Sequence, residues 1–153
     1  MNLDRDFTER ARRVFRDEDD LLAVILRAHL VLEHCLEIRL RRIFKLPDVL
    51  NGRRFGRLGF AQKAAVFVGL THPSNKCQDL LLGFNKLRNR AAHIEGSDLN
   101  QATQKILSTS IVLDPDEDFD PDATVKWAFF MALRELDLAD QILEEKHKGV
   151  RLR

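Results

Sequence analysis

The sequence predicts an all-α protein, folded as an up-and-down helical bundle with additional short helices. Apolar residues recur at helical spacing in several long segments of the chain. No segment shows the strict alternation of a strand or the turn of a hairpin, and no internal repeat is evident. Because amphipathic helices bury their apolar stripes against one another, a bundle is the expected architecture.

Composition indicates one globular domain over residues 1–153. Of these residues 44% are hydrophobic and 32% are charged, and the formal net charge is +1. A chain of this length can bury a core of its own. Because a protein that coats duplex nucleic acid usually has a large basic excess, any contact with nucleic acid is expected to be local.

The cysteines and the lengths of the apolar runs bear on metal binding and on the cellular compartment. Cys35 and Cys77 lie in apolar helical segments without metal-ligand spacing, so we expect buried thiols, no metal site and no cofactor. No secretory segment follows Met1, and no apolar run approaches the roughly 20 residues of a membrane span. A cytoplasmic protein without membrane contact is therefore expected.

The first part of the chain predicts two helices. Residues 1–17 combine helically spaced apolar side chains with arginines, which is typical of a short amphipathic helix. The acids at 17–20 suit a helix N-terminus, where the macrodipole favours negative charge. The longest helix is expected from about Leu21 to Lys45.

A connection follows the long helix. Residues 45–57 contain one proline and two glycines and predict at most one turn of helix. This segment also contains a basic cluster that could bind phosphate groups or form an ordinary solvated loop. The cluster consists of Arg53, Arg54 and Arg57.

The remaining elements are also helical. Helices are expected over 58–70, 75–92, 98–111 and 121–146, followed by a basic, flexible tail at 147–153. The acidic stretch 114–122 lacks the glycine and the glutamate that a calcium loop requires, so we interpret it as a solvated loop. Within it, Asp120 and Pro121 fit an N-cap and a first helical position.

Two apolar stripes run along the last predicted helix. One consists of Val125, Phe129, Ala132, Leu136 and Leu143. The other consists of Trp127, Met131, Leu138 and Ile142. Two stripes indicate either burial on two sides or one side that is available to a partner.

A polar cluster lies near the end of the predicted helix over 75–92. Its apolar stripe includes Phe84 and Leu87, and Arg88 lies on the flank of this stripe, leaning toward the core. Asn89 and His93 are one helical turn apart and point roughly 100° to 140° away from Arg88. A guanidinium near the core and an imidazole on an open face suit the handling of a phosphate group.

The long helix contains a second polar feature. His29 and Glu33 fall within its apolar stripe, between Leu26 and Leu40. A buried carboxylate must be paired, and the expected partners of Glu33 are His29 and Arg88. We favour a structural polar cluster over a direct catalytic role for Glu33, although the carboxylate could also orient the guanidinium.

These segments resemble a known family. The text KLRNRAAH, after a long helix with the text RAHLVLEHCLEIRL, resembles the HEPN superfamily, including its mannitol-repressor-like branch. The family signature is an arginine, usually followed by a polar residue, with a histidine four to six positions beyond. Here these residues are Arg88, Asn89 and His93. One branch, the antitoxin-paired toxins, has a tyrosine two residues after the histidine, where this chain has Glu95.

The resemblance implies a metal-independent endoribonuclease that acts in a toxin–antitoxin or defence context. His93 would remove the proton of an RNA 2′-hydroxyl, Arg88 would stabilise phosphorane charge, and Asn89 would orient the histidine or bind phosphate. Lys86 and Arg90, together with the arginines of 45–57, are candidate substrate-binding residues. The resemblance also implies a twofold homodimer with paired motifs, RNA as a partner, and an antitoxin or regulatory protein as a further partner.

A second function stays open, because the mannitol-repressor-like branch suggests a non-catalytic regulatory or interaction module. In that case Arg88 and His93 form a structural pair or a binding pocket. No basic helix-turn-helix segment is evident, so sequence-specific DNA binding is not expected.

Overall fold

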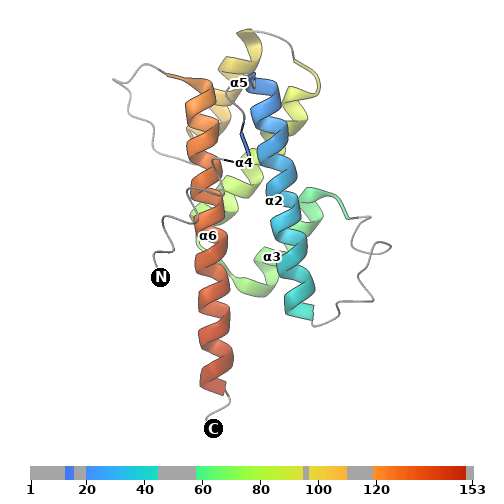
Figure 1. Cartoon of the computed structure of the whole chain (residues 1–153), viewed down its shortest axis with the longest axis vertical. Helices are drawn as coiled ribbons and strands as arrows, with labels where there is room; N and C mark the ends of the chain where they lie inside the picture. The colour runs from blue at the N-terminus through green and yellow to red at the C-terminus, as the bar shows by residue number, and fades with distance from the viewer. Residues whose placement is uncertain (1–12, 16–19, 45–57, 95–96, 110–118, 151–153) are drawn as a thin grey trace.

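The computed structural model describes residues 13–15, 20–44, 58–94, 97–109 and 119–150, and in these ranges it is all-helical. The helices are α2 (Leu21–Phe44), α3 (Phe60–Thr71), α4 (Asn75–Ala91), α5 (Ser97–Leu107) and α6 (Pro121–Val150). In Figure 1, α2 and α6 run down the bundle and α4 runs up against them. The predicted fold class, an all-α bundle, is confirmed.

Capping groups explain where several helices begin and end. Asp20 Oδ1 accepts a hydrogen bond from the Ala23 amide at 2.8 Å, and Asp120 Oδ1 accepts one from the Asp122 amide at 3.0 Å. Such bonds satisfy amide groups that have no partner inside the helix. α3 ends at Thr71, and the C-cap residue His72 adopts the left-handed conformation with φ 48°. The predicted N-cap at Asp120 is confirmed, and Asp20, one of the acids expected at a helix N-terminus, caps α2.

Several predicted segments differ from the structure or lie outside it. The backbone at 147–150 belongs to α6, so this helix extends four residues beyond its expected end at 146. Of the helix predicted within 1–17, only 13–15 is described, and these residues form a turn. The connection 45–57 and most of the acidic stretch 114–122 lie outside the described residues.

The core is formed mainly by α2, α4 and α6. Its largest fully buried side chains include Leu32, Leu36, Phe84, Leu87 and Phe129. Burial of each such side chain stabilises the fold by roughly 1.5–3 kcal/mol. None of the described helices combines the length and the apolar character needed to cross a membrane.

The two stripes of α6 have different environments. Most of the first stripe is buried, including Val125, Phe129 and Leu136. In the second stripe only Met131 is buried, at 9% exposure. The exposed members of the second stripe are Trp127, Leu138 and Ile142. One apolar side of α6 is therefore uncovered by the described part of the chain.

Charged side chains also join the helices. Arg39 of α2, whose side chain is only 11% exposed, forms ion pairs with Asp137 and with Asp140 of α6, the latter at 2.9 Å. Burial raises the pKa of Asp140, and the charges of Arg39 and Arg42 oppose this effect only in part. Because Arg39 reaches two carboxylates, it fixes the position of α2 along α6.

Both cysteines are free thiols. Cys77 is buried, as predicted, whereas Cys35 is half-buried. Burial, reinforced by the charge of Glu135, raises the pKa of Cys77 to about 12. The Cys77 thiol is therefore protonated at neutral pH and acts as a small apolar side chain.

Candidate functional site

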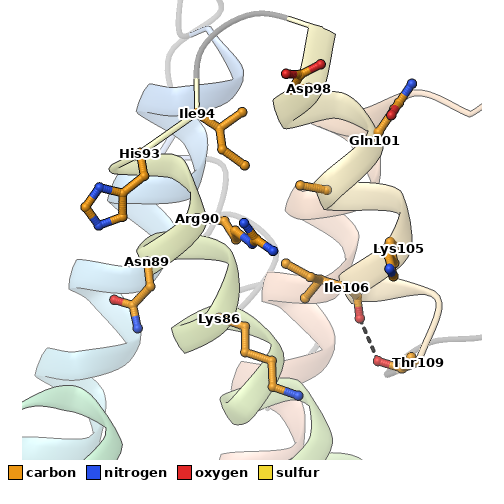
Figure 2. A pocket seen from close by; sticks show the side chains of 11 residues that line it. Lys86, Asn89, Arg90, His93, Ile94, Asp98, Gln101, Lys105, Ile106 and Thr109 are labelled. Carbon is orange, nitrogen blue, oxygen red and sulfur yellow. Dashed lines mark hydrogen bonds between the residues drawn. The ribbon is translucent and has the colours of Figure 1, made fainter.

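Asn89 lies on the outer face of α4, near its C-terminal end, and His93 lies in the turn that follows this helix. Both side chains are exposed. Figure 2 shows them on the same side of this segment, one turn apart. This placement agrees with the prediction of an open face for both residues.

Arg88 differs from the prediction, because it is exposed and does not lean into the core. Its Nη1 donates a hydrogen bond to Asn89 Oδ1 at 3.2 Å. The aliphatic part of a long arginine side chain can follow an apolar surface while the guanidinium stays in water, which explains the difference. The bond brings Arg88 beside the face that carries Asn89 and His93. We call these three residues the Arg–Asn–His cluster.

An open groove lies between α4 and α5, beside the cluster, with a volume of about 790 Å³. Its α4 side is lined by Lys86, Asn89, Arg90, His93 and the adjoining Ile94. Its α5 side is lined by Asp98, Gln101, Ala102, Lys105, Ile106 and the adjoining Thr109. In Figure 2, Arg90 points into the space between the two helices. We call this feature the α4–α5 groove.

The α4–α5 groove has an excess of positive charge. Lys86, Arg90 and Lys105 contribute three cations, and Asp98 contributes one carboxylate. Low-dielectric walls focus such a charge distribution and attract anions. The whole chain has a formal net charge of only +1, so the described lining of this groove is more basic than the chain as a whole.

The predicted substrate-binding residues lie in different parts of the chain. Lys86 and Arg90 line the α4–α5 groove. The prediction for residues 53–57 falls outside the described part of the chain. The contribution of α5 was missed, although a sequence signal exists. The polar residues Asp98, Gln101 and Lys105 recur at helical spacing and define one face of that helix.

The predicted partners of Glu33 are wrong. Glu33 Oε1 accepts a hydrogen bond from Lys63 Nζ at 2.8 Å, and Lys63 also reaches Glu37 Oε2 at 3.3 Å. Among the described contacts of Glu33 there is no hydrogen bond to His29 or Arg88. The Glu33 side chain is 25% exposed, so it is not fully buried either.

The orientation of α2 explains this error. Leu22 and Leu26, which were expected in the buried stripe, are 39% and 38% exposed. The buried face of α2 is rotated toward Ala28 and Leu32, both fully buried. Glu33 therefore lies at the edge of the core, where α3 provides the partner.

Lys63 is the central residue of this ion-pair group, since its side chain is only 4% exposed. Burial lowers the pKa of Lys63, but hydrogen bonds and charges from Glu33 and Glu37 outweigh burial and raise it overall. Burial likewise raises the pKa of Glu37, while Lys63 and Arg41 together lower it below its usual value. Lys63 and Glu37 are therefore both charged at neutral pH. The Lys63–Glu33–Glu37 triad joins α3 to α2, which indicates a structural role.

His29 lies inside the bundle, at 7% exposure. Its ring packs on Phe60, with ring centroids 4.4 Å apart, and its Nε2 has no hydrogen-bond partner among the described atoms. Burial lowers its pKa, the charge of Glu33 opposes this, and the charge of Arg88 adds to it. No described hydrogen bond joins His29 to Glu33 or Arg88, so both interact with His29 through their charges.

The fold and the site together define an all-helical bundle with a basic groove beside an exposed Arg–Asn–His cluster. Within the described ranges, no three or more His, Cys, Asp or Glu side chains are grouped closely enough to hold a metal ion. Comparisons with models of known protein families, with curated proteins and with solved structures found no match. The function is therefore inferred from the geometry of the site and from the motif.

Proposed function

We propose that this chain is a metal-independent endoribonuclease of the HEPN type. The observation that supports this proposal most directly is the hydrogen bond between Arg88 and Asn89. It brings an exposed guanidinium beside the face of the exposed His93 imidazole, at the edge of the α4–α5 groove. A cation, an amide and an imidazole next to a basic groove are suited to a phosphodiester substrate.

Cleavage would use the 2′-hydroxyl of the RNA itself. His93 removes the 2′-hydroxyl proton, because imidazole is the side chain whose unperturbed pKa lies near neutrality. The 2′-oxygen attacks the adjacent phosphorus, the bond from phosphorus to the 5′-oxygen breaks, and the leaving oxygen takes up a proton. The products are a 2′,3′-cyclic phosphate and a 5′-hydroxyl.

The other two residues of the cluster stabilise the charge that develops on the phosphate. The Arg88 guanidinium presents several N–H donors, of which one is used by Asn89. Asn89 accepts that bond with Oδ1, so its amide N–H groups are available to donate to a phosphate oxygen. Asn89 thus positions Arg88 and provides a second donor to the phosphorane oxygens.

A homodimer would supply the proton for the leaving group. One imidazole cannot conveniently serve as general base and general acid on opposite sides of an in-line displacement, whereas two His93 rings related by a twofold axis can. Leu82 is 53% exposed and shares the outward face of α4 with Asn89 and His93 by helical spacing. It is the apolar residue that a twofold contact near His93 would bury.

The same proposal includes a cellular role. A ribonuclease of this type would act on RNA in the cytoplasm, within a toxin–antitoxin or defence system, and an antitoxin or regulatory protein would restrain it. This context derives from the resemblance of the motif at 88–93 to the HEPN superfamily.

A second candidate function is a non-catalytic regulatory or interaction module. The observation that favours it is the exposed stripe of α6, in which Trp127 is 56% exposed and Ile142 is 47% exposed. Apolar side chains grouped on a surface often mark a contact with another protein. In this case the α4–α5 groove would bind an anionic ligand without cleaving it.

Incubation of the purified protein with total RNA in EDTA separates the two functions. The ribonuclease proposal predicts cleavage by the parent protein and loss of cleavage in His93→Ala. A matched control is His34→Ala, because His34 is an exposed histidine on another helix. RNA that stays intact with the parent protein, or equal cleavage by His93→Ala, would favour the non-catalytic module.

A further inference from the structure

We propose that the α4–α5 groove binds the single-stranded RNA segment that flanks the scissile phosphate, an inference that rests on the proposed ribonuclease function. It assigns a substrate form, single-stranded rather than duplex RNA, and it gives α5 a role in binding. Three features of the groove support it: its cations, which have no ion pair within the described ranges, its apolar lining, and the position of Asp98.

The cations of the groove are available to an anionic ligand. Lys86 and Arg90 are one turn apart on α4, and Lys105 lies on the opposite wall. None of the three has an ion pair with a residue in the described ranges. By contrast, Arg39 and Lys63 are neutralised by carboxylates inside the bundle. The groove cations can therefore bind phosphate groups without first breaking an internal pair.

The apolar residues of the groove favour an unpaired strand. Ile94, Ala102 and Ile106 are half-buried and line the same groove. In an A-form duplex the base faces are stacked and the protein meets mainly phosphates and 2′-hydroxyls, so an apolar surface gains little. In a single strand a base can leave the stack and cover such a surface while its phosphates meet the cations.

The position of the Asp98 carboxylate indicates where the phosphates of a bound strand lie in the groove. Figure 2 shows Asp98 near the end of the groove that contains His93, whereas Lys105 lies further along α5, toward the end that contains Lys86. Asp98 repels phosphate, so the phosphates that flank the scissile one should lie along Lys86 and Lys105. At the end near His93, Asp98 and Gln101 can accept hydrogen bonds from base amino groups.

The test is a binding measurement with a strand that cannot be cleaved. The probe is a short, fluorescently labelled 2′-O-methyl oligonucleotide, which lacks the attacking hydroxyl. Fluorescence anisotropy gives the Kd of this strand by itself and the Kd of the duplex that it forms with its complement. We expect the single strand to bind about tenfold more tightly than the duplex, because only its bases reach the apolar lining. Arg90→Ala and Lys105→Ala should each weaken binding of the single strand and reduce the slope of log Kd against log salt by about 0.7.

Matched controls are Arg134→Ala and Lys76→Ala, since both residues are exposed and neither lines the groove. The inference is overturned if the duplex binds as tightly as the single strand, or if the groove variants bind like the controls. Binding that depends on Arg90 and Lys105 supports the groove site whether or not RNA is cut. In that case, intact RNA in the cleavage assay would contradict the ribonuclease function alone.

Discussion

The Arg88 guanidinium donates a hydrogen bond to the side-chain oxygen of the next residue, Asn89, at 3.2 Å. Consecutive side chains of a helix point about 100° apart. The hydrogen bond therefore brings together two side chains that start on different faces of α4. It connects the flank of the buried stripe to the open face that carries His93. The cluster is therefore a surface feature, accessible to a substrate as large as RNA.

Because Arg88 is exposed, its substitution should affect activity without affecting stability. We expect Arg88→Ala to lower kcat on RNA by about 10²–10³-fold, as for loss of a donor to developing charge. The free energy of unfolding should stay within about 0.5 kcal/mol of the parent value. Arg88→Lys should recover only part of the activity, since an ammonium group cannot reproduce the planar fork. RNA cleavage kinetics measure the effect on activity, and urea unfolding measures the effect on stability. Arg134→Ala is the control. Full activity of Arg88→Ala would exclude a role of Arg88 in stabilising charge on the phosphate.

Leu82 provides a test of the twofold arrangement. We expect the parent protein to be a dimer that buries on the order of 1,200–2,000 Å² in total. Leu82→Glu should place a charge in that contact, give a monomer in light scattering and reduce RNA cleavage. Leu70→Glu is the control, because Leu70 is 40% exposed but lies on α3. A parent protein that is monomeric at micromolar concentration would remove the two-histidine mechanism.

The Lys63 triad should contribute to stability rather than to catalysis. Lys63→Met keeps much of the side-chain volume but removes the cation that pairs with Glu33 and leaves Glu37 with Arg41 alone. We expect a loss of about 2–3 kcal/mol of unfolding free energy in urea, below the range for fully buried pairs because both carboxylates retain some contact with water. The control Lys76→Met, at an exposed position, should change the free energy of unfolding by less than about 0.5 kcal/mol. Equal stability of the two variants would mean that the triad adds nothing.

The pKa of Glu37 adds a pH dependence to the same measurement. Its pKa is lowered below 4.5 in the folded state, so its stabilising contribution is complete above that pH and is lost as the pH falls through the lowered value. Lys63→Met should remove most of this dependence.

His29 should make the fold sensitive to mild acid. Its pKa in the folded state is lowered from 6.5, mainly by burial, so the unfolded chain binds a proton more readily as the pH falls below 6.5. Stability should therefore decrease between pH 7 and pH 5, by at most about 1.4 kcal/mol per pH unit for this one group. His29→Phe, which can still pack on Phe60, should show a smaller decrease in urea midpoint over this range. An unchanged pH profile in His29→Phe would show that His29 does not cause the effect.

Helical spacing was sufficient to predict most of the fold. Apolar stripes and capping residues predicted α4 from Asn75 to within one residue of its end, and Asp120 predicted the start of α6. The same reasoning placed Asn89 and His93 on an open face, because the direction of a side chain on a helix depends only on position.

Contacts between helices were harder to predict. The sequence of α2 shows an apolar stripe, but it does not show which edge of that stripe faces α3. Glu33 was therefore assigned to the wrong partners. The position of Lys63, between Phe60 and Phe67 on the buried face of α3, was an available signal for a cation opposite two carboxylates. Arg88 was placed from its Cα direction alone, although a long side chain can turn back to water.

The chemistry of the RNA ends tests the central claim most directly. After digestion of an oligoribonucleotide in EDTA, cleavage by the 2′-hydroxyl with His93 as base predicts 5′-hydroxyl ends that a kinase labels without prior phosphatase treatment. The upstream fragments should carry 2′,3′-cyclic phosphates, and His93→Ala should yield neither product. Fragments with 5′-phosphate ends, or identical products from His93→Ala, would contradict the proposed mechanism.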